Sequence, residues 1–247
     1  MSYLGVLTDV LARPFSTRFY VFAAVSTGFA LLGRLIRGVT MGGAVAGAVI
    51  CFVLLWTAGL AGFAALFSVF ALTWAATRIG YHRKQRLGTA EAKAGRDTLQ
   101  VLANLGTAAV CAILFAALWT ERRMLVAMAA ALAEAAADTV SSEIGQAIGG
   151  IPRSITTWQK VAPGTNGGIT VTGTLAGAAA GFLVAIVFAV IRGLGVRSAI
   201  ISAAAAICGM IADSILGATI EHSEGLGNNG VNFISTVTAA AFALLVS

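Results

Sequence analysis

Residues 124–145 read MLVAMAAALAEAAADTVSSEIG, and this stretch decides the fold of the chain. Its opening residues are all apolar, and it is long enough to cross a bilayer as a helix, which takes about 20 mainly apolar residues. Three carboxylates, Glu134, Asp138 and Glu143, lie towards its end. Because a carboxylate at membrane depth is costly, it usually marks a functional site. The stretch therefore predicts a membrane-spanning helix with chemistry at one end.

The composition of the whole chain agrees with a membrane location. Of its 247 residues, 58% are hydrophobic and 11% are charged, and the mean hydropathy is +0.90. Soluble domains carry roughly a quarter charged residues, so the chain is an integral membrane protein. Its formal charge of +6 does not indicate nucleic acid as a partner, because basic residues of membrane proteins gather in short cytoplasmic loops.

The hydropathy pattern predicts an all-α, polytopic helical membrane protein with seven or eight transmembrane helices. The predicted spans are 19–33, 43–58, 60–76, 98–119, 124–141, 169–191, 198–219 and 231–246, of which the first three and the last are short. Many of their residues are alanine or glycine, which lets helices pack closely in a membrane. Residues 19–247 are predicted to form a single transmembrane catalytic domain.

The first 18 residues are predicted to be an interfacial amphipathic segment. Leu4, Leu7, Val10 and Leu11 recur at helical spacing, and Pro14 ends the pattern. Such a pattern is typical of a short helix that lies on the membrane surface.

The basic residues orient the predicted spans. With eight spans, one side receives six of them: Arg13, Arg18, Arg122, Arg123, Arg192 and Arg197. The other side receives ten: Arg34, Arg37, Arg78, Arg83, Lys84, Arg86, Lys93, Arg96, Arg153 and Lys160. The second side is predicted to be cytoplasmic, in a bacterial or archaeal plasma membrane or a membrane of the cyanobacterial organelle type. Asp97, Asp138, Glu143 and Asp213 all belong to this half.

Two carboxylates of the quoted stretch share a helical face. Glu134 and Asp138 are four residues apart, and Ser141 follows three residues later. Mg²⁺ would relieve their repulsion, since it is usually held by one or two carboxylates together with substrate phosphates. The alternative is a structural pairing with Arg153, Lys160 or another loop cation.

A glycine-rich loop follows the acidic stretch. Arg153 and Lys160 flank a polar segment, and residues 163–168 read PGTNGG. Closely spaced glycines let backbone N–H groups turn towards an anion, and the next helix would add its positive dipole end. Pro-Gly and Asn-Gly also mark ordinary turns. The acidic helix before it favours a phosphate-binding loop, with Gly164, Thr165, Asn166, Gly167 and Gly168 as its contact residues, and no Walker lysine follows.

Two further spans carry polar residues. At the start of the span 98–119, Asp97, Gln100 and Asn104 share a face, which could contact a nucleotide or substrate or bond to neighbouring helices. Gly209 and Gly217 flank Asp213 at intervals of four, so another helix can approach closely there. Asp213 could serve as a second metal ligand or pair with an arginine.

On these residues the chain resembles the integral membrane family that includes the plant and cyanobacterial phytyl-phosphate kinase. The resemblance begins near Gly33 and covers nearly all of the chain beyond it. The blocks that carry it are Thr77-Arg78, Arg83-Lys84, Gly88, Gly95-Arg96, Val101-Leu102-Ala103-Asn104, Asp138-Thr139, Ser142-Glu143-Ile144-Gly145, Arg153, Val161, Pro163-Gly164-Thr165, Gly167-Gly168, Gly173-Thr174, Asp213-Ser214 and Gly217-Ala218.

A fainter likeness extends to CTP-dependent polyprenol kinases and phosphatidate cytidylyltransferases. Asp138, Ser142, Lys160 and the glycines from Gly164 follow the order of the motif in those enzymes. The chain departs from it at Val161, where those enzymes have a serine beside the lysine.

The resemblance implies a kinase that moves the γ-phosphate of a nucleoside triphosphate, with CTP as the implied donor, to an isoprenyl monophosphate such as phytyl, geranylgeranyl or farnesyl phosphate. Asp138, Lys160 and Arg153 would be catalytic, and Asp138, Glu134, Glu143 and Asp213 would hold Mg²⁺. The nucleotide and phosphates would contact Arg96, Asp97, Asn104, Ser142 and the loop residues Gly164, Thr165, Asn166, Gly167 and Gly168. Intramembrane carboxylates also fit a secondary transporter or ion-coupled carrier, which is the alternative hypothesis.

Overall fold

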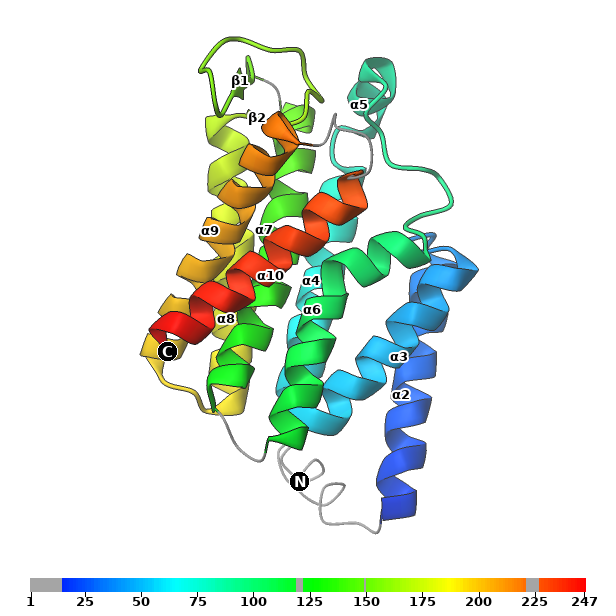
Figure 1. The fold of residues 1–247 in the computed structure, drawn as a ribbon. Helices are drawn as coiled ribbons and strands as arrows, with labels where there is room; N and C mark the ends of the chain where they lie inside the picture. The colour runs from blue at the N-terminus through cyan, green and yellow to red at the C-terminus, as the bar shows by residue number, and fades with distance from the viewer. Residues whose placement is uncertain (1–14, 119–121, 149, 221–226) are drawn as a thin grey trace.

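The computed structural model describes residues 15–118, 122–148, 150–220 and 227–247. Long helices run between the two ends of a bundle, and a short strand pair lies at one end (Figure 1). The helices are α2 (Phe15–Leu35), α3 (Met41–Ala58), α4 (Leu60–Arg78), α5 (Tyr81–Leu87), α6 (Thr98–Ala117), α7 (Arg122–Ile148), α8 (Val171–Arg192), α9 (Val196–Thr219) and α10 (Asn228–Val246). The strands are β1 (Arg153–Ser154) and β2 (Gly168–Ile169), and they pair antiparallel.

The all-α polytopic fold is confirmed. Within the described residues, seven helices are long and apolar enough to cross a membrane: α3, α4, α6, α7, α8, α9 and α10. The eighth predicted span corresponds to α2, which has 21 residues and packs beside α3 (Figure 1). Residues 1–14 of the predicted interfacial segment lie outside the described residues, and residues 15–18 belong to α2.

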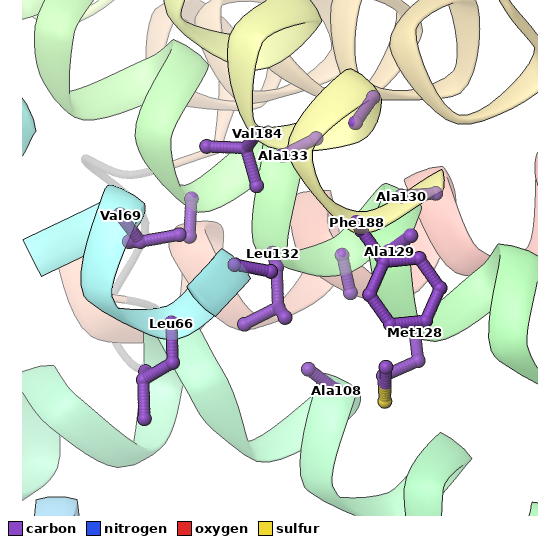
Figure 2. Close-up of a cluster of buried hydrophobic side chains, with 14 of the residues drawn as sticks. Leu66, Val69, Ala108, Met128, Ala129, Ala130, Leu132, Ala133, Val184 and Phe188 are labelled. Atoms are coloured by element: carbon purple, nitrogen blue, oxygen red, sulfur yellow. The ribbon is translucent and has the colours of Figure 1, made fainter. Parts of the chain in front are cut away.

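The helix α7 is the centre of the bundle. In its apolar window 83% of the residues are buried, against 33–44% in the other six candidate spans. Met128 and Leu132 of α7 are fully buried and meet Val184 and Phe188 of α8, as Figure 2 shows. The alanines between them leave room for neighbours on every side, which is why this helix rather than a bulkier one occupies the centre.

Glycines bring α8 against the backbone of α7. Gly173, Gly177 and Gly181 recur every four residues on α8. A Cβ atom on Gly177 would collide with the Ala137 carbonyl and with Ser141, so only glycine fits this position. The contact thus fixes the carboxyl-terminal half of α7, which carries the acidic residues.

The predicted end of the fifth span was wrong. The span was predicted to end at residue 141, but α7 continues to Ile148. Two contacts hold the extra turns: Glu143 pairs with Lys84, and Gly145 packs against the Thr170 hydroxyl. Ser142 and Glu143 therefore lie on the helix and not in the loop after it. The carboxyl ends of α4, α7 and α9 all point to the end of the bundle that carries β1 and β2 (Figure 1); that this end is cytoplasmic stays a prediction.

Candidate functional site

Carboxylates from two helices meet inside this end of the bundle. Glu134 of α7 is only 1% exposed, and Asp138 and Asp213 lie close enough to it for electrostatic repulsion. Ser235 of α10 is within hydrogen-bonding reach of Glu134. Gly209 of α9 makes this approach possible, since its Cβ position lies 2.8 Å from the Ser235 carbonyl. The predicted close helix contact at Gly209 is thus confirmed, with α10 and α7 as the partners.

The carboxylate group fits a cation that arrives with phosphates. Glu134 Oε1 is buried and has no hydrogen-bond partner among the described residues. Within the same residues, no three His, Cys, Asp or Glu side chains are grouped as a ready metal site. Mg²⁺ commonly takes one or two protein carboxylates and completes its shell with substrate phosphates and water. Half-buried Asp138 and Asp213, beside Glu134, fit that kind of binding better than a resident metal centre.

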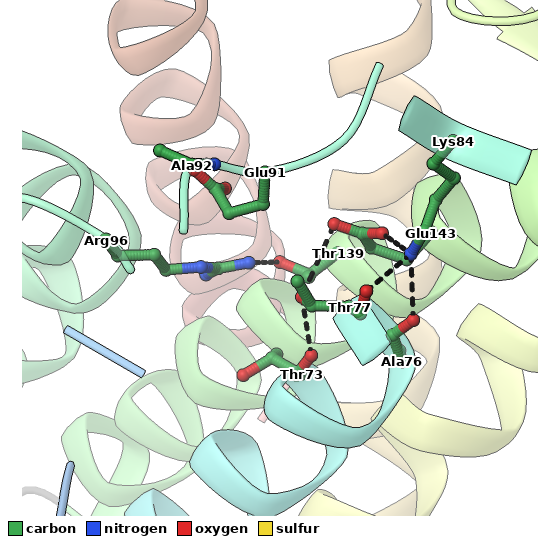
Figure 3. Close-up of polar contacts among 9 residues, drawn as sticks. All are labelled: Thr73, Ala76, Thr77, Lys84, Glu91, Ala92, Arg96, Thr139 and Glu143. Atoms are coloured by element: carbon green, nitrogen blue, oxygen red, sulfur yellow. Dashed lines mark hydrogen bonds and ion pairs between the residues drawn. The ribbon is translucent and has the colours of Figure 1, made fainter. Parts of the chain in front are cut away.

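Glu143 has a different partner from the one predicted. Lys84 of α5 is completely buried and forms an ion pair with Glu143 (Figure 3). Lys84 Nζ also donates to the carbonyls of Ala76 and Thr77 at 3.1 and 2.8 Å, and Thr77 Oγ1 donates to Glu143 Oε1 at 3.3 Å. The metal role predicted for Glu143 is therefore replaced by an ion pair that joins α7 to α4 and α5.

The glycine-rich loop packs on α9 beside Asp213. Gly167 has a positive φ of 71° and lies against the Ser214 carbonyl and Ala218. Gly164, with φ of 86°, packs against Thr89 in the loop after α5. The loop therefore lies over the end of the helix that carries Asp213, as the kinase hypothesis requires.

The cations of this loop are on its surface. Arg153 and Lys160 pair through their backbones as an antiparallel bridge, and both side chains are exposed. Arg153 Nη1 donates to the Trp158 carbonyl at 2.7 Å. Neither cation neutralises Glu134, whose neighbours are the carboxylates and Ser235. Their exposed side chains are positioned to meet an anion that approaches from outside the bundle.

Among the predicted nucleotide contacts Asp97, Ser142 and Asn104, the side chains of Asp97 and Asn104 make structural hydrogen bonds within the protein. Asp97 is exposed and caps α6: its Oδ1 accepts from the Gln100 N–H at 2.9 Å, and Gln100 Oε1 accepts from the Asp97 N–H at 2.8 Å. This reciprocal capping box explains the residue without a ligand. Ser142 is exposed on α7. Asn104 is buried, and its Nδ2 donates to the Gln100 carbonyl at 2.8 Å.

A cavity of about 510 Å³ lies on another face of α7. Its walls come from α2, α3, α4, α6 and the loop after α5, and α7 contributes Ala135. Among the described residues, four cations line it, namely Arg37, Arg78, Lys93 and Arg96, and Glu91 is the only carboxylate. Sequence reasoning missed this cavity because its walls are far apart in the chain. The sequence offered partial signals: Arg96 and Asn104, predicted as nucleotide or phosphate contacts, both line the cavity, and the basic cluster around Arg78 fits attraction of an anionic nucleotide or lipid phosphate as well as orientation of the spans.

The cavity and the carboxylate group adjoin along α7. Arg96 Nη2 donates to Thr139 Oγ1 at 3.1 Å (Figure 3), and Thr139 directly follows Asp138. Successive helical residues point about 100° apart, so Ala135, which lines the cavity, and Glu134, which faces Ser235 of α10, point in different directions from α7. The two regions therefore meet at neighbouring residues of a single helix.

The match to a known family decides the identity of the chain. Residues 24–240 match the family described as integral membrane protein DUF92. The chain belongs to the DUF92 family. The resemblance seen in the sequence blocks is thereby confirmed, and the DUF92 match covers both the cavity and the carboxylate helices.

Relatives of this DUF92 protein occur in archaea, cyanobacteria and plants. It is 31% identical over 231 residues to an uncharacterized membrane protein of Methanocaldococcus jannaschii, covering 93% of this chain and 94% of the relative. It is 34% identical over 201 residues to an uncharacterized membrane protein of Synechocystis, covering 78% and 76%. It is 30% identical over 221 residues to the chloroplastic protein VTE6 of Arabidopsis thaliana, covering 86% and 66%. No solved structure matches the chain.

Proposed function

We propose that this DUF92 protein is a membrane-embedded kinase that transfers the γ-phosphate of a nucleoside triphosphate, with CTP as the first candidate, to an isoprenyl monophosphate. In this reaction the bond between the γ-phosphorus and the β–γ bridging oxygen breaks, and an acceptor phosphate oxygen bonds to that phosphorus. The products are the nucleoside diphosphate and the isoprenyl diphosphate. The observation that carries the proposal is the convergence of the carboxylates of α7 and α9 with the glycine-rich loop.

The chain's own residues can hold a magnesium-bound triphosphate. Asp138 and Asp213, with Glu134 behind them, would hold Mg²⁺, which when bound neutralises charge on the phosphates and orients them. In the loop, the N–H groups of Thr165 and Gly168 are used in internal turns. Within the described residues, this leaves the N–H groups of Gly164, Asn166 and Gly167 for a phosphate.

The surface cations complete the phosphate site. Lys160 and Arg153 flank the loop with exposed side chains and would bind the triphosphate from its outer side. Phosphoryl transfer depends mainly on positioning and on neutralising charge, and it needs no covalent intermediate with the protein. In the proposed reaction these residues therefore only bind and align the phosphates.

The direct test is a product assay with purified protein in detergent. Labelled γ-phosphate on CTP, ATP, GTP or UTP is supplied with geranylgeranyl monophosphate and Mg²⁺, and the lipid fraction is analysed for labelled diphosphate. We expect a labelled diphosphate with at least one nucleotide, and an Asp213→Asn variant that retains its melting temperature but forms far less product. No labelled lipid with any nucleotide, together with substrate flux into liposomes without nucleotide consumption, would favour the carrier instead.

A further inference from the structure

We propose that the cavity on the other face of α7 is the binding site for the acceptor and that it takes an amphiphile with one apolar chain and one phosphate. The phosphate would lie beside Arg96 and the chain would extend into the apolar end. The identity of the acceptor as a kinase substrate rests on the proposed function, whereas the binding itself is argued from the cavity.

The lining of the cavity changes character along α4. Leu66, Val69 and Phe70 line it in the first half of the helix, and Thr73, Thr77 and Arg78 line it towards the end. Leu66 and Arg78 are about 18 Å apart along the axis at 1.5 Å per residue. The cavity thus has an apolar end within the bundle and a polar end at the level of the loops. An amphiphile has the same two-part character.

The apolar end is built for a hydrocarbon chain. Phe29 of α2 and Phe70 of α4 meet edge to face there, with ring centroids 5.3 Å apart. Leu105 of α6 and Ala135 of α7 add aliphatic surface. A Cβ atom on Gly47 of α3, which also lines the cavity, would meet nothing within 4 Å. This glycine therefore leaves open space inside the cavity.

The polar end carries a positive charge held in place by the protein. Arg78 is fixed by its 2.5 Å hydrogen bond to the Ile36 carbonyl and by the Trp74 ring, whose centroid lies 4.3 Å from its guanidinium carbon. Arg96 is oriented by Thr139. Glu91, the one carboxylate that the described part of the chain contributes to the lining, accepts from the Ala92 N–H and from the Gln100 amide at 3.1 and 3.4 Å. Four cations against this engaged carboxylate favour an anionic headgroup.

The size of the cavity favours a lipid with one hydrocarbon chain. Its volume of about 510 Å³ lies within the range of roughly 300–1,000 Å³ that is typical of pockets for a single small ligand. The two acyl chains of a phospholipid would need considerably more apolar space than one isoprenyl chain. We therefore expect selection of a single-chain lipid phosphate over phosphatidate.

The position of Arg96 explains how the acceptor would reach the donor. Because Arg96 is bonded to Thr139, a phosphate beside Arg96 lies next to the turn of α7 that carries Asp138. Acceptor and donor phosphates would then approach α7 from adjacent faces. The hydrocarbon chain of the acceptor would remain at membrane depth.

The test measures lipid binding without nucleotide, in nanodiscs, by competition with labelled geranylgeranyl monophosphate. Gly47→Phe fills the open space in the cavity, and Gly28→Phe makes the same change where a Cβ meets nothing and no cavity is lined. Arg96→Gln removes the phosphate partner, and Arg34→Gln removes an exposed arginine of the same region that does not line the cavity. Melting temperatures check that each variant is folded.

We expect Gly47→Phe to weaken geranylgeranyl monophosphate binding at least about tenfold while leaving binding of short isopentenyl monophosphate unchanged. Arg96→Gln should weaken the binding of geranylgeranyl monophosphate and of isopentenyl monophosphate by about tenfold or more, since a charge-assisted hydrogen bond is lost. The Gly28 and Arg34 variants should bind like the unmodified protein. Geranylgeraniol and phosphatidate should compete poorly.

Two outcomes would overturn the inference: full geranylgeranyl monophosphate binding in folded Gly47→Phe protein, or equal competition by the alcohol or by phosphatidate. These outcomes are separable from failure of the kinase proposal. Cavity-dependent binding without product in the transfer assay would leave this inference standing and remove the kinase. If the Gly47→Phe variant formed product at the same rate as the unmodified protein, the kinase proposal would stand and the assignment of the cavity to the acceptor would fall.

Discussion

The two halves of the bundle are packed in opposite ways. Helices α7 to α10 approach one another through small residues, and Gly177 and Gly209 are in contact with neighbouring backbone or side chains. Helices α2 to α4 instead meet through aromatic rings, such as Phe22 of α2 with Trp56 of α3 and Phe29 of α2 with Phe63 of α4, and a cavity remains between these helices and α6. Close packing holds carboxylates of different helices together against their repulsion, whereas loose aromatic packing leaves room for a ligand.

This difference suggests that the two halves, which meet along α7, bind different ligands. The tight half carries fixed negative charge, which suits a metal-bound triphosphate. The open half carries apolar surface and positive charge, which suits the phosphate of a lipid. The following changes act on one half, on the contact between the halves, or on matched positions in both, and they test whether the two halves are separate.

The largest effect is expected from Asp138→Asn, which removes a charge from the tight half. We expect phosphate transfer to fall by about a hundredfold or more, because fixed charges that align a phosphoryl group make contributions of this order. Binding of geranylgeranyl monophosphate without nucleotide should stay as it was. A parallel loss of lipid binding would show that the two halves are not separate sites.

Next comes Lys84→Met, which acts at the joint between the halves. It leaves the Glu143 carboxylate and two carbonyls of α4 without their buried cation, so we expect a loss of stability of about 3–5 kcal/mol. The Lys84→Met/Glu143→Leu double variant should lose less. Arg86→Met, an exposed change on the same short helix, is the control. Unfolding in detergent measures all three, and equal stability of Lys84→Met and Arg86→Met would contradict the buried ion pair.

A smaller effect is expected from matched glycine changes in the two halves. Gly177→Leu places a side chain against Ala137, Ser141 and Met210, and overpacking of this kind destabilises by about 1–3 kcal/mol. Gly47→Leu, in the open half, should change the melting temperature little because its Cβ meets nothing within 4 Å. Similar melting temperatures for the two variants would remove the contrast between a tight and an open half.

The smallest effect is expected at Asp97. Asparagine caps a helix as well as aspartate, so Asp97→Asn should leave both stability and transfer unchanged, whereas Asp97→Ala should lower stability by about 1 kcal/mol. Transfer rates and melting temperatures of both variants measure this. A loss of transfer in the asparagine variant as large as that of Asp138→Asn would restore the predicted nucleotide contact.

The fold could be predicted closely because hydropathy decides where a membrane helix can form. The span predicted at 60–76 corresponds to α4 at Leu60–Arg78, and the span predicted at 198–219 corresponds to α9 at Val196–Thr219. The prediction failed at the end of α7, since polar residues such as Ser142, Glu143 and Gln146 interrupt the apolar run beyond 141. They remain helical because Lys84, far away in the chain, neutralises Glu143.

The site could be predicted in part, because local patterns of residues are visible in the sequence and contacts between distant segments are not. Carboxylates at span ends and a Gly-rich loop are visible in the sequence, and the structure brings Asp138, Asp213 and Gly167 to one end of the bundle. Pairings between distant segments are not visible there. The ion pair of Glu143 and the cavity around Arg96 depend on how helices pack, which no local pattern of residues records.

The most direct test of the central claim is an experimental structure with Mg²⁺, a non-hydrolysable CTP analogue and geranylgeranyl monophosphate bound together. We predict the triphosphate between Asp138, Asp213 and the loop at residues 163–168, and the lipid phosphate beside Arg96 with its chain in the cavity lined by Gly47. Both ligands on the same face of α7, or a triphosphate remote from Asp138, would contradict the account.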